Sequence, residues 1–344
     1  MSSESPLRVG LIGAGANTAK MHIPGLRLRA NVEVAAVANR SYESGQRIAT
    51  EYSIPKVYES VEELIADPTL HAVCIGTWPY KHRDYTITAL EHGKHVLCEA
   101  RMAMDLQEAE EMLAASERHP ELVAQIVPAP FDFRLGPTIT RMIAEGELGD
   151  IREVTVSMLN GGGLDASVPI HWRQRRVYSG RNVMMLGIFN EVIQRWLGDT
   201  ESVMADGAVV VPWRFDPERG ENVEVDVPDT FVVAARMANG ARALYHLSSM
   251  TAGAPPPGIV VYGTKGTVRW QMGDQATWAR HGQPFNTIEP DAGTDRGWKA
   301  EEDFIASIRE GAPARLTNFR DGMRYMRFID GAWRSWQEQR AIRL

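Results

Sequence analysis

A glycine-containing segment near the amino terminus has the residue types that bind phosphate. Gly13, Ala14 and Gly15 come directly after a short apolar run, Arg8–Gly13, and directly before a segment with a helical pattern. Glycines here permit a tight turn and let backbone N–H groups approach a pyrophosphate, while the helix N-terminus supplies partial positive charge. The third small position of this pattern is Thr18 rather than Gly or Ala. We expect a nucleotide-binding loop; the alternative is an ordinary glycine turn.

The end of the second apolar run carries the residues that would select between the two nicotinamide dinucleotides. Val32–Val37 is followed shortly by Asn39, Arg40 and Ser41. A site for NAD usually has a carboxylate at this position, which binds the ribose 2′-hydroxyl and would repel a 2′-phosphate. Arg and Ser can instead pair with a phosphate. The sequence therefore predicts NADP as the cofactor, with NAD as a further possibility and a simply solvated Arg40 as the alternative.

A parallel sheet is needed to position these loops, and the first part of the chain has its pattern. Four short apolar runs are typical of buried strands: Arg8–Gly13, Val32–Val37, His71–Gly76 and His95–Cys98. Helical patterns separate them, and two of these begin with a capping pair, Ser60 with Glu63 and Asp105 with Glu108. Strand–helix alternation predicts an α/β Rossmann domain with a doubly wound parallel sheet over residues 1–125.

The pattern changes after about residue 150. Six β-rich runs follow one another with little helix between them: Ile151–Leu159, Ser202–Val211, Thr230–Ala238, Arg242–Met250, Gly258–Tyr262 and Gly266–Trp270. A helix over Met184–Leu197 precedes most of them, and Glu301–Trp336 is again helical and a candidate to pack back on the first domain. We expect an α+β domain with a mostly antiparallel sheet over residues 126–344, for substrate binding and oligomerisation.

Composition excludes several classes of function. The chain has 344 residues, 37 Lys and Arg and 44 Asp and Glu, giving a net charge of −7 without a basic block. Nucleic acid is therefore not an expected partner. No apolar stretch reaches the ~18 residues of a membrane span, and the polar Met1–Pro6 segment has no signal-peptide core. Two lone cysteines, Cys74 and Cys98, indicate a reducing cytoplasm, and no residue spacing suggests a metal site.

Further motifs are spread over almost the whole length. They are Met21-His22-Ile23-Pro24 after the glycine loop, Thr77 to His82, Gly93 to Glu99, Trp172-Arg173, and Gly263 to Thr267. Together they make the chain resemble the glucose–fructose oxidoreductase, inositol dehydrogenase and rhizopine-catabolism (Gfo/Idh/MocA) family. The resemblance implies a Rossmann domain, a C-terminal domain with a large open sheet, and reversible hydride transfer between NAD(P) and a hydroxyl or carbonyl carbon.

The same resemblance implies the partners. The expected substrate is a small molecule such as a sugar, a cyclitol or a sugar acid. The open sheet is an oligomer face in this family, so a homo-oligomer, a dimer or a tetramer, is expected. Together with the residues above, the motifs give these expected cofactor contacts: Gly13, Ala14, Gly15, Asn17, Asn39, Arg40, Ser41, Thr77, Trp78, His82, Glu99, Trp172 and Arg173.

The sequence departs from the family pattern at the positions of the proton-transfer residues. Transfer of a hydride to a ketone needs a proton donor near the oxygen, and the reverse direction needs a base. The family uses the Lys of an E-K-P motif and the Asp and His of D-x-G-x-H. Here Ala100 stands at the Lys position and Arg101 at the Pro position, while Met185 and Phe189 replace the Asp and the His. The usual proton relay is therefore absent.

Three residues are the candidates for an atypical catalytic set. Arg101 stays charged, so it can polarise an oxygen but is a poor base. His171 can titrate near neutral pH, with an ordinary loop histidine as the alternative. Glu99 matches the family glutamate near the nicotinamide. Tyr178 and Asn190 are further polar candidates nearby in sequence, with solvent or interface contacts as the alternative.

A group of arginines follows the Trp172-Arg173 motif, comprising Arg173, Arg175, Arg176 and Arg181. The group suggests an anionic substrate or the cofactor phosphates, or else a solvated basic loop. Three functions remain open: an oxidoreductase with an atypical proton-transfer set, a catalytically inactive NADP(H)-binding sensor or partner protein, and redox-assisted elimination. Elimination also needs a base, so the sequence does not favour it.

Overall fold

The computed structural model describes residues 5–295 and 297–344, so Met1–Glu4 of the polar amino terminus lie outside the described residues. Contacts divide the chain into two units. The first runs to Pro128 and includes Lys299–Met323, whereas the second comprises Ala129–Trp298 and Arg324–Leu344. A segment far along the sequence therefore completes the unit that begins at the amino terminus.

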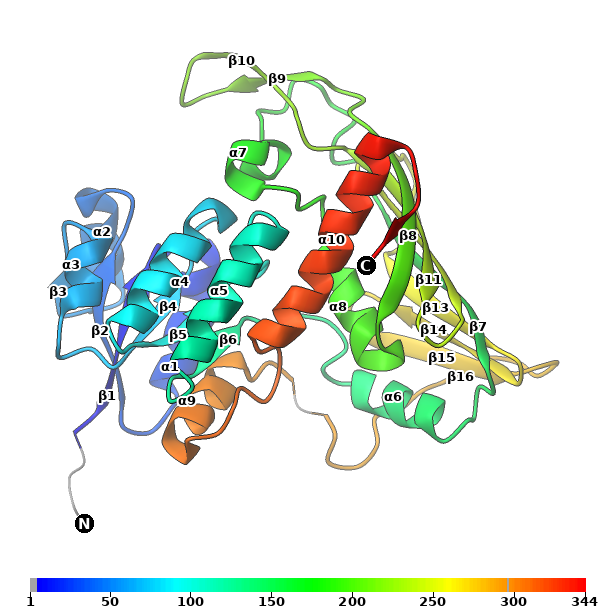
Figure 1. The fold of residues 1–344 in the computed structure, drawn as a ribbon, viewed down its shortest axis with the longest axis horizontal. Coiled ribbons are helices and arrows are strands. Elements are labelled where there is room, and N and C mark those ends of the chain that lie inside the picture. The colour runs from blue at the N-terminus through cyan, green and yellow to red at the C-terminus, as the bar shows by residue number, and fades with distance from the viewer. Residues whose placement is uncertain (1–4, 296) are drawn as a thin grey trace. The chain divides into compact units, whose positions relative to one another are not determined.

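The first unit is built on a six-stranded sheet (Figure 1). Its strands are β1 (Leu7–Ile12), β2 (Val32–Ala38), β3 (Lys56–Val57), β4 (Ala72–Ile75), β5 (His95–Cys98) and β6 (Ala124–Ile126). They lie in the order β3-β2-β1-β4-β5-β6, and every neighbouring pair is parallel. All four residues of β4 are buried, as expected for a central strand of a parallel sheet. The predicted doubly wound sheet is confirmed.

Helices connect these strands. They are η1 (Thr18–His22, a π-helix), α1 (Ile23–Arg27), α2 (Tyr42–Glu51), α3 (Val61–Ala66), η2 (Pro79–Lys81), α4 (His82–Glu91), α5 (Leu106–Arg118) and α9 (Ala300–Glu310). The predicted capping boxes are formed in their N-cap half: Ser60 accepts a hydrogen bond from the Glu63 N–H, and Asp105 accepts one from the Glu108 N–H. The Glu108 carboxylate accepts from the Met104 N–H rather than from that of Asp105. Gln125 of β6 donates to the Ala300 carbonyl, which holds α9 in this unit.

The second unit contains a nine-stranded sheet and a separate hairpin (Figure 1). The sheet is formed by β7 (Ile151–Leu159), β8 (Thr200–Ala208), β11 (Thr230–Met237), β12 (Arg242–Ser248), β13 (Gly258–Gly263), β14 (Gly266–Gln271), β15 (Gln275–Arg280), β16 (Asn286–Thr287) and β17 (Ile342–Arg343). The hairpin pairs β9 (Trp213–Asp216) with β10 (Glu221–Glu224). In the order β16-β15-β14-β13-β7-β12-β11-β8-β17, only β7 and β12 are parallel neighbours. The predicted mostly antiparallel sheet is confirmed.

One face of this large sheet is packed and the other is open. Along β12, Tyr245 is buried whereas Leu244 is 45% exposed, the alternation expected for a half-buried strand. The helices of this unit are α6 (Gly136–Ala144), η3 (Trp172–Gln174), α7 (Arg176–Ser179), α8 (Leu186–Leu197) and α10 (Phe319–Glu338), which begins in the first unit. The Tyr245 ring contacts Phe328 of α10, with ring centroids 4.9 Å apart. Helices α8 and α10 thus cover the packed face.

Helix α8 begins at Leu186, slightly later than the predicted Met184. Met184 has a φ of +42°, a left-handed conformation that cannot be part of an α-helix. The predicted Glu301–Trp336 helix is two helices, because Gly311 ends α9 in a left-handed conformation. Backbone conformation at single residues therefore sets both helix boundaries.

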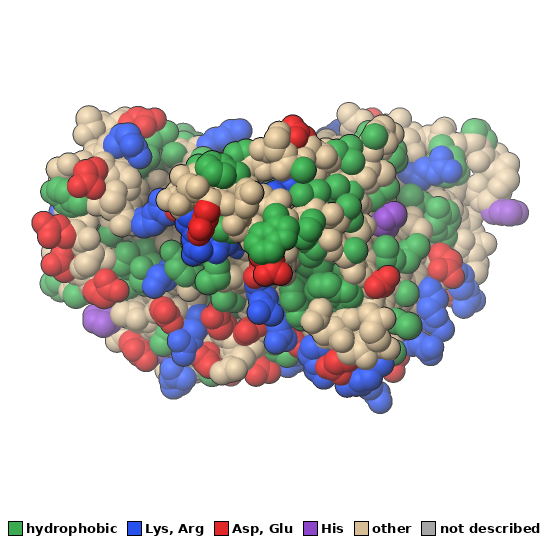
Figure 2. Space-filling model, turned by 90° about the horizontal axis from the view of Figure 1, so that it is seen from above, with side chains coloured by type: hydrophobic (Ala, Val, Ile, Leu, Met, Phe, Trp, Pro, Cys, Tyr) green, Lys and Arg blue, Asp and Glu red, His purple; other side chains and the backbone are tan. Residues whose placement is uncertain are grey.

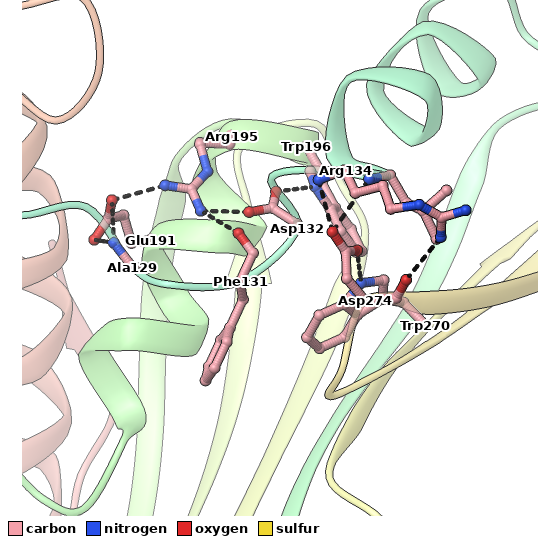
Figure 3. A network of polar contacts seen from close by, with 10 residues as sticks. Ala129, Phe131, Asp132, Arg134, Glu191, Arg195, Trp196, Trp270 and Asp274 are labelled. Atoms are coloured by element: carbon pink, nitrogen blue, oxygen red, sulfur yellow. Dashed lines mark hydrogen bonds and ion pairs between the residues drawn. The ribbon is translucent and has the colours of Figure 1, made fainter. Parts of the chain in front are cut away.

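An ionic network with two buried carboxylates fixes α8 within the second unit (Figure 3). Arg195 of α8 lies 2.5 Å from Asp132 and 2.8 Å from Glu191; these three residues are called the Arg195 triad below. The Trp196 Nε1–H also donates to Asp132, and the Ala129 N–H lies 3.2 Å from both Glu191 oxygens. Burial raises the pKa of Asp132, and Arg195 opposes that shift. Buried charges persist only when paired in this way, so the network fixes the rotation of α8.

On one face of the protein, the charges of the described residues are of both signs. On the face drawn in Figure 2, acidic and basic side chains lie intermixed among apolar and polar ones. Within residues 5–295 and 297–344, no helix has both the length and the apolar character needed to cross a bilayer.

Candidate functional site

The glycine loop follows β1 and exposes backbone. Gly13 has a φ of +73°, in the left-handed region that favours glycine, and a Cβ there would lie 2.5 Å from the Thr77 side chain. At Gly15 a Cβ would meet no atom within 4 Å, and the Gly15 carbonyl accepts from the Ala19 N–H of the following helical turn. The loop therefore presents open backbone at the start of a helical segment. These residues fit a pyrophosphate group.

Thr18, the departure from the usual small third residue, is accommodated by a glycine elsewhere. Thr18 is buried, and a Cβ on Gly76, just beyond β4, would lie 2.0 Å from its hydroxyl oxygen. The absence of a side chain at Gly76 thus provides the space that Thr18 fills. The loop keeps close helix–sheet packing with the larger residue.

The residues after β2 partly hold the loop itself. The Asn39 side-chain oxygen accepts a hydrogen bond from the Ala14 N–H at 2.7 Å. Ser41 is the N-cap of α2, because its hydroxyl accepts from the Ser44 N–H. Arg40 is exposed between them. The structure therefore gives Asn39 and Ser41 positioning roles and places Arg40 at the surface beside the loop.

The loops after β4 and β5 are tied together by a buried histidine. His82 has its Nε2 atom 2.9 Å from the Thr77 carbonyl oxygen and its Nδ1 atom 3.0 Å from the Arg101 carbonyl oxygen. Burial lowers the pKa of His82, so the ring is neutral and donates a hydrogen bond to only one of these two carbonyl oxygens. Its full burial makes it a positioning residue for these two loops. Trp78 lies half-buried in the first of them, with its ring centroid 6.4 Å from that of Tyr80.

Glu99, directly after β5, belongs to a chain of polar side chains. Its Oε1 atom accepts a hydrogen bond from Asn17 and lies 2.9 Å from Nε2 of His22. The Nδ1 atom of His22 lies 2.5 Å from Glu301 of α9. Burial opposes the charge on His22, but Glu301 and Glu99 outweigh it and raise the pKa of His22 to about 9.

Glu301 was not predicted from the sequence. Its partner His22 is 279 positions away, and Glu301 lies among ordinary helical residues of α9. The sequence signal nearby was the motif that contains His22, and this motif does not indicate which carboxylate the histidine contacts. Long-range packing alone brings the two residues together.

The segment that replaces the family's E-K-P motif is also well defined. The Ala100 N–H donates to Oε2 of Glu99 at 3.2 Å, and the Ala100–Arg101 peptide bond is cis. Arg101 is 4% exposed. Its guanidinium keeps its charge at any physiological pH.

In the second unit, His171 precedes the helical turn η3. Its Nδ1 atom accepts a hydrogen bond from the Arg173 backbone N–H at 3.2 Å. The backbone N–H of His171 donates to the Gln174 side-chain oxygen at 2.9 Å. Burial and the Arg173 charge lower the pKa of His171, so the ring is neutral. Because Nδ1 is an acceptor, the proton lies on Nε2. The free ring nitrogen is therefore a hydrogen-bond donor, which argues against the expected proton-accepting role.

The arginine group does not form one basic surface. Arg175 lies 3.0 Å from Asp216, with both side chains nearly buried, and Arg181 forms an ion pair with Asp330. Arg173 lies over the ring of Trp172, 4.2 Å from its centroid. Two of the four charges are therefore neutralised, and an anion site formed by all four arginines is excluded.

The α8 candidates are core residues. Phe189 is fully buried and its ring centroid lies 5.3 Å from that of Phe131. Asn190 is also fully buried; it donates to the Tyr245 hydroxyl and accepts from Gln194. Both ends of the Asn190 amide are used inside the core, so the structure gives this residue a packing role. Tyr178 lies under the Arg175 guanidinium.

No group of three or more His, Cys, Asp or Glu side chains with metal-binding geometry occurs in the part of the chain that the structure describes. Cys74 and Cys98 are free and buried in β4 and β5. Burial raises the pKa of both thiols, so both are protonated.

Comparison with known families gives two matches. Residues 7–126 match the oxidoreductase family with an NAD-binding Rossmann fold, GFO_IDH_MocA. Residues 138–269 match the GFO/IDH/MocA C-terminal domain. The two matches cover the glycine loop, the β4 and β5 loops and most of the large sheet.

Individual proteins show the same similarity. An uncharacterised oxidoreductase of Synechocystis, sll0816, is 26% identical over 273 residues, which is 78% of this chain and 72% of that protein. A 1,5-anhydro-D-fructose reductase of Ensifer adhaerens is 42% identical over 109 residues, about a third of each chain (32%). The solved structure of a levoglucosan dehydrogenase in complex with NADH and L-sorbose has a TM-score of 0.85 at 22% identity, over 98% of both chains. That structure supports the fold.

Proposed function

The chain belongs to the Gfo/Idh/MocA family of NAD(P)-dependent oxidoreductases, and we propose that it transfers a hydride between NADP(H) and a hydroxyl or carbonyl carbon of a sugar, cyclitol or sugar acid. The observation that carries the proposal is the open backbone at Gly15, which fits a pyrophosphate at the edge of the parallel sheet. The bound dinucleotide supplies the hydride acceptor or donor. The named 1,5-anhydro-D-fructose and levoglucosan relatives support a sugar-like substrate.

The preference for NADP rests on the residues after β2. Arg40 is exposed beside the glycine loop, and neither neighbour is a carboxylate. A guanidinium pairs with a 2′-phosphate, whereas the carboxylate typical of NAD sites would repel it. The other residues expected to hold the cofactor are those of the glycine loop with Asn17, the Thr77-Trp78 loop and Glu99, and Trp172 with Arg173.

The proposed catalytic set stabilises charge on the substrate oxygen. Hydride transfer requires an oriented substrate carbon and donors aimed at the oxygen. Arg101 supplies a permanent positive charge, and neutral His171 supplies the Nε2–H donor. Glu99 acts as an ionised carboxylate, held by Asn17 and His22.

A second function is favoured by a specific observation. Ala100 and the buried Phe189 leave two family proton-transfer positions apolar, which a cofactor-binding sensor without turnover would tolerate. A turnover assay separates the two functions. Purified protein with NADP⁺ is tested against sugars, cyclitols and sugar acids, and with NADPH against keto-sugars, while NADPH fluorescence reports binding. Turnover supports the enzyme; binding without turnover over the whole panel supports the sensor; no binding contradicts both.

We also propose that the protein is cytoplasmic and that copies of it associate through the open face of the large sheet. Leu244, Ala234 and Met204 are direct neighbours across β12, β11 and β8, and all three are exposed. Exposed apolar side chains on adjacent strands are typical of an interface. Sedimentation velocity of the protein and of Leu244→Glu tests this face, because the charge should shift the protein towards the monomer.

A further inference from the structure

Three ionisable side chains form a buried cluster at the carboxyl edge of the parallel sheet. His22 lies between Glu99, at 2.9 Å, and Glu301, at 2.5 Å, and these three residues are called the His22 triad. The side chains of His22 and Glu301 are almost fully buried, whereas that of Glu99 is 14% exposed. Asn17, in the turn after the glycine loop, donates to Glu99. Glu99 is therefore the member of the triad that reaches the loop.

The sheet order places Glu99 on one particular side of the glycine loop. A dinucleotide lies across the carboxyl edge of such a sheet, with one nucleotide over each half. Asn39 and Arg40 follow β2 and mark the half that takes the adenosine end. Glu99 follows β5, on the other side of β1. The His22 triad thus belongs to the half that takes the nicotinamide end.

The geometry also fixes the charge of the triad. Both ring nitrogens of His22 face a carboxylate oxygen, and both can donate a hydrogen bond only when the imidazole is protonated. Burial opposes ionisation of Glu99, but His22 outweighs it and lowers the pKa of Glu99. With two carboxylates and one imidazolium, the triad carries one net negative charge at neutral pH.

Other groups near the triad keep their charge state from neutral pH to about pH 10. His82 is neutral because burial lowers its pKa, and the buried thiols of Cys74 and Cys98 stay protonated because burial raises theirs. Arg101 stays positive. Glu302 of α9 stays ionised, because Lys299 and Arg29 lower the pKa of its carboxyl. His22 is therefore the group whose charge changes in this range.

We propose that the His22 triad favours the oxidised cofactor. The nicotinamide ring is a cation in NADP⁺ and neutral in NADPH, so a buried negative charge beside it stabilises the oxidised form. Glu99 is the group next to the cofactor, while His22 and Glu301 are positioning residues that set its orientation and the net charge. The proposal rests on the proposed function, because it requires a nicotinamide cofactor at this edge.

A purely structural role for the triad would have a different signature. Helix α9 packs closely on α1, since a Cβ on Gly25 would lie 2.6 Å from the Glu301 carboxyl carbon. If the triad only joined these helices, its loss would lower stability and affect the two cofactor forms equally. The ratio of the two dissociation constants therefore separates the electrostatic role from the structural one.

Calorimetric titration of NADP⁺ and NADPH tests the proposal without any turnover. The proteins are the unchanged chain, Glu99→Gln, Glu301→Gln, and the control Glu302→Gln on the exposed side of the same helix turn. Loss of the Glu99 charge should raise the ratio of the NADP⁺ to the NADPH dissociation constant about three- to tenfold. Glu301→Gln should raise it at neutral pH as well, and Glu302→Gln should leave it unchanged.

The pH dependence gives a second readout. As pH rises through about 9, His22 loses its proton and the net charge of the triad changes from −1 to −2. NADP⁺ should then bind more tightly relative to NADPH. In Glu301→Gln this step should move to lower pH, because one of the carboxylates that hold the proton is gone. The 2′-phosphate titrates near pH 6 and contributes no step in this range.

The outcomes separate this inference from the proposed function. If both forms bind but Glu99→Gln and Glu301→Gln leave the ratio and the pH step unchanged, the inference is overturned and the proposed function stands. If neither form binds the unchanged chain, both fail. Should the variants unfold, as their melting temperatures will show, the unchanged chain still decides: a ratio that stays flat through pH 9 contradicts the inference.

Discussion

Each unit of the molecule contains a cation held between two carboxylates, and the two clusters differ in what the cation is. In the second unit Arg195 lies between Asp132 and Glu191, and in the first unit His22 lies between Glu99 and Glu301. Arginine cannot lose its charge in a protein, whereas histidine can. The Arg195 triad is therefore an ionic cluster of fixed charge, whereas the charge of the His22 triad can change with pH.

The surroundings of the two clusters agree with this difference. The Arg195 triad receives additional hydrogen bonds from Trp196 and from the Ala129 backbone, all within the core around α8. The His22 triad is joined through Glu99 to Asn17, which is exposed beside the glycine loop. One cluster ends in the core and the other ends at the edge where we propose that the cofactor binds.

The largest loss of stability is expected from removing the cation of the Arg195 triad. Arg195→Met would leave Asp132 and Glu191 buried without their cation, which typically costs about 3–5 kcal/mol of unfolding free energy. Urea unfolding measures the loss. The matched control is Arg334→Ala, whose exposed pair with Glu338 should contribute less than about 1 kcal/mol. Equal effects of the two substitutions would contradict the role given to the Arg195 triad.

The His22 triad should make the free energy of unfolding depend on pH. The pKa of His22 is raised from 6.5 to about 9 in the folded protein, so its contribution is complete below pH 6.5 and is lost as pH rises through about 9. The contribution should be on the order of 3 kcal/mol. Unfolding at a series of pH values measures this slope in the protein and in His22→Gln. An identical slope in both would show that His22 is not its source.

Cofactor selection should depend on Arg40 and on neither triad. Arg40→Asp replaces a group that pairs with a 2′-phosphate by one that repels it, so the preference for NADP over NAD should fall by at least about tenfold. Titration of NADPH and NADH measures the ratio. The control is Arg47→Asp, which makes the same change of charge at an exposed arginine on α2 and should leave the ratio unchanged. If Arg40→Asp also leaves it unchanged, Arg40 does not bind the 2′-phosphate.

The smallest loss of stability is expected at Glu302, the residue next to the His22 triad in sequence. Glu302 follows Glu301 on α9, but its exposed side chain pairs with Arg29 and Lys299 at the surface. Glu302→Gln should therefore change the unfolding free energy by less than about 1 kcal/mol. A loss as large as that of His22→Gln would show that the position on α9, rather than burial of the charge, determines stability.

Local sequence patterns were sufficient for the longer central elements but not for the contacts between distant residues. Ten strand runs, the two N-cap side chains and the glycine loop depend on residues within a few positions of each other and were predicted, whereas short or peripheral strands such as β3, β6 and β15 were not. The Thr18–Gly76 packing, the burial of Asn190 and the contact between His22 and Glu301 depend on folding the whole unit. No spacing rule connects such residues, because their separation is set by tertiary structure.

The replacement of the family's histidine illustrates the same limit. Phe189 could be identified in the sequence as an apolar residue at a catalytic position. Its packing against Phe131 shows in addition that the position now belongs to the core. The Arg195 triad on the same helix fixes this orientation.

The central claim, that the glycine loop binds a dinucleotide, is tested most directly by NADPH titration of the protein and of Gly15→Val. A Cβ at Gly15 would meet no protein atom within 4 Å, so we expect the variant to fold with an unchanged melting temperature. It would, however, occupy the space in which the pyrophosphate approaches the backbone. We predict saturable NADPH binding that Gly15→Val weakens at least about tenfold. Binding that is absent from the protein, or equally tight in Gly15→Val, would contradict the account.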